Sequence, residues 1–502
     1  MTLRSSSPLW VALVALACNG GGAAARPTSS TQDHPAGSTT MTSTDSSTPA
    51  LPSLGSSIVG WLEQGEHARV RATFDAAMAK ALPTDEAVAG LWQSIVAKLG
   101  RCQKQLGTSA KDEGAYHVVL VTCAFEAMPM DVRLVFDAEQ KLAGIQLRPS
   151  ENTDAFGPRP QTPKPPFPYA ARDVAYPNPA DGSTLAGTLT VPEGAGPHPA
   201  VLLVTGSGAQ DRDETIFGHK PFWVLADHLG RHGVAVLRVD DRGIGKTTGD
   251  PTHATIETHA TDVEAGLAFL KTQPDVDPKR LGLVGHSEGG IIAAVVAARS
   301  KDVAFVVSLA GTGLSGAEIN PLQVEAILRA KGGMSEDGIR AIVAAQRAIM
   351  KLLATDASDA ALDAAVNAAF AAAEQYAPGA LGAKGTPAGR AAEVASLRSD
   401  WFRSFVKLDP ASHWSRVTVP VLALVGDRDT QVPADPNLGA IAAALAKAGN
   451  HDAETEKLPG LNHLFQRAQT GLVDEYATLE ETFAPAALER VTSFVRQRAG
   501  LR

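Results

Sequence analysis

One serine of the chain has the sequence context of a nucleophile. Residues 285–289 (GHSEG) follow the apolar stretch 281–284 (LGLV) and precede 291–299 (IIAAVVAAR), which has a helical pattern. In such a G-x-S-x-G arrangement the serine occupies a sharp turn between a strand and a helix. The small neighbours tolerate the turn, and the helix N-terminus favours developing negative charge. The pattern predicts Ser287 as the nucleophile of an acyl-transfer reaction.

A serine hydroxyl is barely ionised at neutral pH, so it needs a neighbouring base. In proteins with this elbow the order along the chain is serine, acid, histidine. His463 follows a short predicted strand over 454–458 and is the predicted base. His451 lies earlier, in a polar loop, and His413 precedes the strand that should carry the acid.

The acid should follow the apolar stretch 419–426 (VPVLALVG), where both Asp427 and Asp429 lie. Spacing alone leaves these two candidates open. The oxyanion formed on attack needs two N–H donors. The residue after the nucleophile, Glu288, supplies one backbone N–H, and the loop 205–213 (TGSGAQDRD) is the predicted source of the other.

Together, these stretches make residues 171–502 resemble the α/β-hydrolase family, whose members include esterases, dienelactone-hydrolase-like enzymes and serine aminopeptidase-like enzymes. The resemblance implies that the acid is Asp429, at the fourth position of G-x-x-D-x-Q-V, and that Asp427 caps the turn. It also implies Ser207 as the second oxyanion donor, with Gly208 as the alternative. We expect the run 211–213 (DRD) to hold this loop through mutual ion pairs. The stretch 240–246 (DDRGIGK) is expected to be a tight loop after a strand, not a phosphate cradle.

The elements that must position these residues form an α/β pattern. Nearly continuous apolar runs alternate with helical segments, as expected for buried parallel strands in a doubly wound sheet. The predicted strands are 185–191, 200–204, 234–239, 281–285, 303–309 and 419–425. The Ala-rich helical insertion 312–412 is expected to form a cap whose apolar side lines an acyl pocket.

A separate small domain is predicted over 54–150. Residues 74–82 and 91–99 have helical spacing, and 116–125, 130–136 and 142–147 are predicted strands. Two helices on an antiparallel sheet would be an α+β unit, which resembles the uncharacterised domain that often precedes such hydrolases. We expect a packing or binding accessory, joined to the hydrolase by the Pro-rich linker 151–170.

The first 53 residues are expected to lie outside both domains. Residues 1–17 have the apolar core of a signal peptide, and Cys18 follows a small residue, which resembles a bacterial lipoprotein signal. Cleavage near residues 23–25 is the alternative and would give a soluble secreted protein. Residues 18–53 are predicted to be a disordered tether. We therefore expect export to the bacterial cell envelope or beyond, with membrane contact only through a lipid on Cys18.

Three cysteines are present. If Cys18 carries lipid, Cys102 and Cys123 remain as a pair, which an oxidising compartment would join as a disulfide. Two buried free thiols are the alternative. The chain has no metal-binding spacing such as C-x-x-C, and we predict neither a metal nor a cofactor.

Composition excludes one class of partner. The formal net charge is −9 without long basic runs, which argues against nucleic acid. The leading hypothesis is a carboxylesterase that cleaves small to medium acyl esters through an acyl-enzyme. A peptidase, aminopeptidase-like enzyme or amidase with the same triad is the second. The third is an envelope binding protein with a vestigial hydrolase domain, against which the three separated triad residues argue.

Overall fold

The structure, a computed structural model, describes residues 51–150 and 152–501. These residues form two compact units that meet at Pro158 and Arg159, a boundary that falls inside the linker predicted over 151–170. The predicted signal peptide, Cys18 and the tether up to residue 50 lie outside the described residues.

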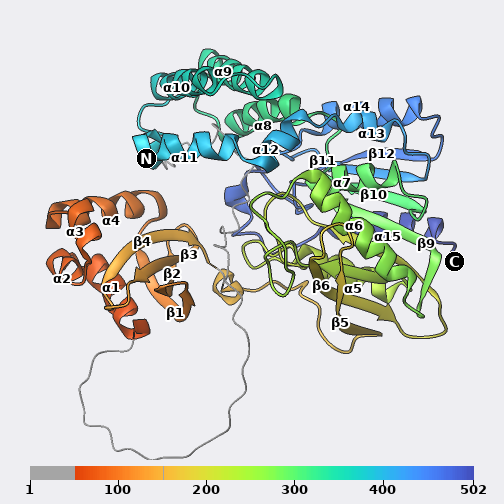
Figure 1. Cartoon of the computed structure of the whole chain (residues 1–502), viewed down its shortest axis with the longest axis horizontal. Helices are drawn as coiled ribbons and strands as arrows, with labels where there is room; N and C mark the ends of the chain where they lie inside the picture. The colour runs from red at the N-terminus through yellow and green to blue at the C-terminus, as the bar shows by residue number, and fades with distance from the viewer. Residues whose placement is uncertain (1–50, 151, 502) are drawn as a thin grey trace, which may run out of the picture. The chain divides into compact units, whose positions relative to one another are not determined.

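The N-terminal unit packs four helices against a four-stranded antiparallel sheet (Figure 1). Its core contains Ile58 and Leu62 from the first helix and Val119 and Leu134 from the sheet. The helices are α1 (Leu51–Gln64), α2 (His67–Arg71), α3 (Ala76–Ala81) and α4 (Asp85–Leu99). The strands, in spatial order, are β1 (Cys102–Glu113), β2 (Tyr116–Phe125), β3 (Pro129–Phe136) and β4 (Leu142–Pro149).

This unit has more elements than the two helices and three strands predicted. The helix α1 begins at Leu51, inside the segment predicted as a tether. It was not predicted because its Gly and Ser residues obscure the apolar stripe formed by Ile58, Val59 and Leu62. The edge strand β1 was missed because its sequence (CQKQLGTSAKDE) is polar and largely exposed. This segment is a strand because its backbone pairs with β2, although its sequence lacks the alternation of apolar and polar residues typical of a strand. Phe74, predicted within a helix, instead precedes α3 and forms a bridge with Leu142.

A disulfide joins Cys102 of β1 to Cys123 of β2, whose Cα atoms lie 5.5 Å apart. The Cys123 side chain is buried in the core of the unit. The bond fastens the polar edge strand to the apolar strand beside it.

Removal of this disulfide is expected to destabilise the N-terminal unit. The bond closes a loop with a sequence separation of 21 residues, for which the chain-entropy relation gives about 3 kcal/mol. In the full chain, Cys102→Ser/Cys123→Ser should therefore lower the urea midpoint of the transition that reports on this unit. Peptide mass mapping of the wild-type protein without reductant checks the bond itself, and two free thiols would contradict the pairing.

The second unit is built on an eight-stranded sheet with the order β12-β11-β10-β9-β7-β8-β6-β5. The six strands from β12 to β8 are mutually parallel, and β6 and β5 add antiparallel neighbours at one edge. The strands are β5 (Tyr169–Pro177), β6 (Thr184–Pro192), β7 (His198–Val204), β8 (Ala235–Val239), β9 (Val276–His286), β10 (Phe305–Leu309), β11 (Val421–Gly426) and β12 (Ala453–Leu458). The edge strand β5 was not predicted, because most of its side chains are at least partly exposed.

Helices cover both faces of this sheet, as the apolar runs predicted. Along β7, Leu202 packs into one core with α6 (Ile256–Lys271), α7 (Glu288–Ala297) and α14 (Ala434–Lys447). Its neighbours Val201 and Leu203 pack on the opposite side with α5 (Pro221–Arg231) and α15 (Pro485–Arg498). This is the expected doubly wound α/β arrangement.

A helical insertion separates β10 from β11, where the cap was predicted. Figure 1 shows α8, α9 and α10 gathered on one side of this unit. They enclose small apolar cores of their own, including Phe370 and Phe402. The insertion contains α8 (Gly316–Lys331), α9 (Glu336–Ala354), α10 (Asp359–Tyr376), α11 (Pro387–Leu397), α12 (Asp400–Lys407) and α13 (Pro410–Trp414). Among the described helices, none is long and apolar enough to cross a membrane.

Candidate active site

Ser287 occupies a strained turn between β9 and α7. Its φ is 54° and its ψ is −118°, and its amide donates a hydrogen bond to the Leu309 carbonyl at 2.8 Å. A Cβ on Gly285 would lie 2.0 Å from the Gly289 carbonyl oxygen, and one on Gly289 would lie 2.1 Å from the Val204 carbonyl oxygen. Only glycine fits at both positions, because the turn brings backbone against backbone. Backbone strain held by its surroundings in this way is typical of functional sites.

The predicted base and acid meet at the carboxyl edge of the parallel strands. His463, on the loop after β12, donates a hydrogen bond from Nδ1 to Oδ2 of Asp429, on the loop after β11, at 2.7 Å. Both side chains are buried. The other carboxylate oxygen of Asp429 accepts hydrogen bonds from the amides of Gln431 and Val432, each at 2.8 Å. A fixed carboxylate holds the imidazole in the tautomer whose Nε2 can accept a proton.

The structure separates the two candidate acids. Asp427 does not contact His463; its Oδ1 accepts a hydrogen bond from the Gly460 amide at 2.6 Å. Asp427 was expected to cap the turn of its own loop. Its carboxylate instead joins this loop to the loop that carries His463. Arg428 donates to the Gln469 carbonyl.

The residues predicted as oxyanion donors lie beside the nucleophile. Ser207, Ser287 and Glu288 line one small cavity. In the neighbouring part of the loop, the Gly206 amide is occupied by the Glu214 carboxylate at 2.7 Å. The Ser207 hydroxyl is buried and has no hydrogen-bond partner among the described residues, so it is available to a ligand in this cavity.

A buried ion pair beneath the site was not foreseen. Nδ1 of His286 lies 2.9 Å from Oε1 of Glu214, and its Nε2 lies 3.0 Å from the His463 carbonyl oxygen. Burial alone would lower the pKa of His286, but the Glu214 carboxylate outweighs burial and the pKa is raised. His286 thus links the loop of Gly206 to the loop of His463. Nothing in the sequence near Glu214 indicates this role, because the pair forms between segments far apart along the chain.

The prediction that residues 211–213 form ion pairs with one another was wrong. Arg212 does not pair with its neighbours but with Asp240 of the next loop, at 2.6 Å. Asp213 pairs with Arg238 of β8, and Asp211 accepts hydrogen bonds from the amides of Asp213 and Thr215. Arg212 and Asp213 therefore pair with residues of other segments, whereas Asp211 is bonded within its own loop. The loop is still held by ion pairs.

Two small cavities flank the nucleophile. The first is lined by four apolar side chains of the core and the cap, Ile291, Ile319, Phe405 and Val432, and by polar residues that include Thr312, Gln323 and Gln431. The second lies on the His463 side and contains Gln210, Ile216 and Leu464. In the described part of the chain, no group of three or more His, Cys, Asp or Glu side chains is arranged to hold a metal ion.

Comparisons with known proteins place both units. Residues 56–145 match a family described as a protein of unknown function (DUF3887). Among curated proteins, the chain is 30% identical over 223 residues to esterase EstD of Thermotoga maritima, covering 44% of this chain and 51% of EstD. It is 33% identical over 146 residues to the uncharacterised protein Rv2307c of Mycobacterium tuberculosis, covering 29% and 48% of the two chains. The chain thus spans about half the length of these curated relatives.

Solved structures resemble the chain more distantly. The alpha/beta hydrolase GrgF of Penicillium is 18% identical with a TM-score of 0.41, covering 66% of this chain and 100% of GrgF. Esterase Pf2001 of Pyrococcus furiosus is 16% identical, also with a TM-score of 0.41, covering 66% and 92%. Residues 201–475, more than half of the chain, match the alpha/beta hydrolase family. This match covers Ser287, Asp429 and His463, and it agrees with the mixed sheet and the elbow. The chain belongs to the alpha/beta hydrolase family.

Proposed function

We propose that this chain is a serine carboxylesterase that uses Ser287, His463 and Asp429 as a catalytic triad. The observation that carries the proposal is the 2.7 Å hydrogen bond from His463 to Asp429, beside a cavity that both Ser287 and His463 line. A nucleophile, a base and a group that orients the base are the parts that acyl transfer requires.

The proposed reaction has two halves. Ser287 Oγ attacks the ester carbonyl carbon while its proton passes to Nε2 of His463. The backbone N–H groups of Glu288 and Ser207 stabilise the oxyanion. Collapse breaks the bond to the leaving oxygen, which takes the proton from His463, and the alcohol departs. Water then attacks the acyl-enzyme with His463 as base, which releases the acid and restores Ser287.

The site favours an acyl group of small to medium size. The apolar side chains of Ile291, Ile319, Phe405 and Val432 lie beside Ser287, where they would bury an aliphatic chain. The proposed acyl side is thus shared between α7 of the core and α8 and α12 of the cap.

The carboxylates of the cap do not favour a peptidase. Five carboxylates of the cap have partners outside the site: Glu318 accepts a hydrogen bond from Ser315, Glu325 pairs with Arg329, Glu374 accepts from the Gly379 amide, Glu393 pairs with Lys384, and Asp400 contacts His253. None of them lines the cavities at Ser287. The helices of the cap themselves therefore place no carboxylate in these cavities for the charged end of a peptide.

Esters are therefore expected to be cleaved with a higher kcat/KM than amides. An alkoxide leaves with modest help, whereas an amine must be protonated by His463 at the right moment. The measurement compares an unactivated alkyl ester, a p-nitrophenyl ester and an aminoacyl p-nitroanilide. Faster cleavage of the anilide than of the alkyl ester would overturn this preference in favour of an amidase or peptidase with the same triad.

Export to the cell envelope is proposed alongside this activity. The proposed signal peptide and lipid attachment at Cys18 lie outside the described residues. The Cys102–Cys123 disulfide supports export, because such bonds persist in oxidising compartments.

A further inference from the structure

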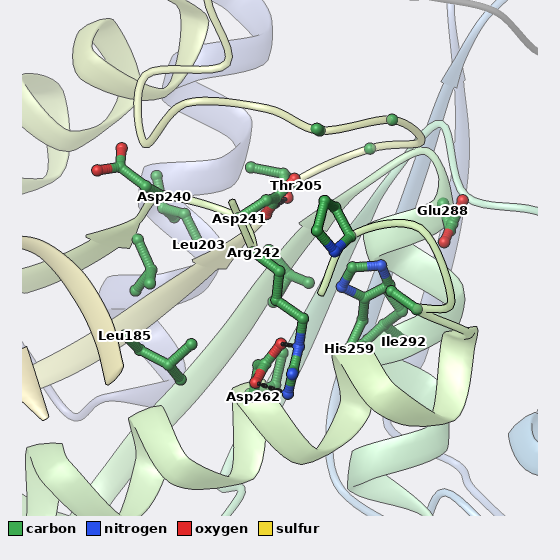
Figure 2. Close-up of a pocket in the computed structure, with 18 of the residues that line it drawn as sticks. Leu185, Leu203, Thr205, Asp240, Asp241, Arg242, His259, Asp262, Glu288 and Ile292 are labelled. Atoms are coloured by element: carbon green, nitrogen blue, oxygen red, sulfur yellow. Dashed lines mark hydrogen bonds and ion pairs between the residues drawn. The ribbon is translucent and has the colours of Figure 1, made fainter. Parts of the chain in front are cut away.

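A larger cavity lies next to the site and takes no part in the mechanism above. It has a volume of about 260 Å³, and its lining includes residues of the oxyanion loop, of the loop after β8, of α6 and of the cap. Figure 2 shows its lining, with Leu185 and Glu288 on opposite sides of the view. Neither Ser287 nor His463 lines it, but Glu288 lines both this cavity and the small apolar one beside Ser287.

Two of the carboxyl groups in this cavity have no cationic partner. Glu288 is buried and Asp241 is partly buried, and neither forms an ion pair with any described residue. Both oxygens of Glu288 accept from the Trp401 indole N–H, at 3.0 and 2.9 Å. Asp241 accepts from the Thr205 hydroxyl at 2.7 Å and from the Gln210 amide at 2.8 Å. Burial of a carboxylate is costly unless a positive charge compensates it.

Other carboxylates of the same lining show the contrast. Asp240 pairs with Arg212 and Asp262 pairs with Arg242, both at 2.6 Å. Figure 2 shows the Arg242–Asp262 pair within the lining. The fold thus supplies cations to some carboxylates of this cavity and leaves Glu288 and Asp241 without one.

The electrostatics of these two groups are coupled. Burial raises the pKa of Asp241 well above its usual range, and the carboxylates of Glu214 and Glu288 raise it further. Glu288 is the first residue of α7, where the helix dipole favours a negative charge. The cavity is therefore best suited to receive positive charge at Glu288.

Another residue of the same lining also points to a polar ligand. Tyr176 lines the cavity and is only 5% exposed. Its hydroxyl is buried and has no hydrogen-bond partner among the described residues. Buried polar groups without a partner are uncommon in folded proteins and call for an explanation such as a bound ligand. As an acceptor, this oxygen suits an N–H donor.

The position of His463 decides which part of a substrate reaches the cavity. His463 must protonate the leaving oxygen, so the alcohol lies on the side of the cavity that His463 lines. Glu288 lies on the other side of Ser287, among the apolar residues proposed for the acyl group. The larger cavity shares Glu288 with this acyl-side cavity, and it shares Gly206, which has no side chain, with the cavity on the His463 side. The charged side chain common to the larger cavity and the site therefore lies on the acyl side.

We propose that this cavity binds a protonated amine carried by the acyl part of the substrate, with the Glu288 carboxylate as its counter-ion and Asp241 and Tyr176 as further acceptors. The proposal rests on the proposed ester hydrolysis and deepens it. Trp401 holds the Glu288 carboxylate in place from the cap. The preferred substrates are then esters of amino acids or of longer amino-substituted acids, not esters of simple fatty acids.

The test compares matched pairs of methyl esters that differ only in charge. Methyl 6-aminohexanoate and methyl heptanoate have the same chain length, with an ammonium in place of a methyl group. L-alanine methyl ester and methyl isobutyrate form a second pair, in which the ammonium lies closer to the ester carbonyl. In the wild-type protein at neutral pH, kcat/KM is expected to favour the cation by at least about tenfold in one pair, as for a charged hydrogen bond.

Charge removal at Glu288 should abolish this preference. Glu288→Gln keeps the backbone N–H and an oxygen that can accept from Trp401, so the ratio of the two kcat/KM values is the readout, and it should fall to about one. Asp241→Asn should also lower this ratio, but by less than Glu288→Gln does. Glu325→Gln, an exposed carboxylate of the cap paired with Arg329, is the control and should leave the ratio unchanged.

The outcomes separate the two proposals. Hydrolysis of the neutral esters with no preference for the cations overturns the amine subsite and leaves the esterase intact. A preference that survives Glu288→Gln also overturns the subsite. If no ester of any kind is hydrolysed, the proposed function fails, and the subsite fails with it.

Discussion

Ser287→Ala is expected to lower kcat by at least about 10⁴-fold while the fold remains intact. The substitution removes the hydroxyl of Ser287, which lines the same small cavity as His463, so no acyl-enzyme can form on this residue. Triad members act as a unit, and His463→Ala should therefore be nearly as severe. Hydrolysis of a p-nitrophenyl ester measures the loss. Labelling by a fluorophosphonate, located by peptide mass, should be confined to residue 287 and absent in the variant.

A matched variant distinguishes loss of chemistry from loss of structure. Ser493→Ala removes an exposed hydroxyl of α15, which donates a hydrogen bond to Glu489, and should retain wild-type activity. Thermal unfolding of Ser287→Ala should resemble that of the wild type, because the nearby glycines and the strand hold the turn. Activity above about a tenth of wild type in Ser287→Ala would mean that another residue is the nucleophile.

Asp429→Asn is expected to lower kcat by about 10²- to 10⁴-fold with little change in KM. Asp429 accepts the proton of His463 Nδ1 at 2.7 Å, and its second oxygen is held by two backbone amides. An Asn oxygen that stays on those amides would leave an NH₂ group facing Nδ1. The imidazole would then adopt the wrong tautomer and could not take the serine proton.

Asp427→Asn is the matched control for this prediction. The two residues lie on the same loop, but Asp427 only accepts a hydrogen bond from the Gly460 amide, which an Asn oxygen can also accept. Its kcat should stay within a few-fold of wild type. The reverse ranking of the two variants would assign the acid role to Asp427.

Much of the hydrolase unit was predictable from the sequence because its signals are local. Buried parallel strands appear as continuous apolar runs, and the elbow requires glycines at fixed positions around Ser287. These constraints operate within a few residues, so periodicity and spacing reveal them. Edge elements such as β1 and β5 lack that signal, since their side chains are largely exposed and pairing with a neighbour defines them.

The sequence by itself indicated the class of fold and predicted a nucleophile and the candidates for base and acid. It also reduced the acid to two residues of one loop. Only the tertiary structure brought Asp429 and not Asp427 to His463. Only the tertiary structure joined Glu214 to His286, and Trp401 of the cap to Glu288. The physical reason is that these contacts form between side chains separated by 34 to 113 positions along the chain. Their geometry depends on how the loops meet at the sheet edge, which no local pattern of residues records.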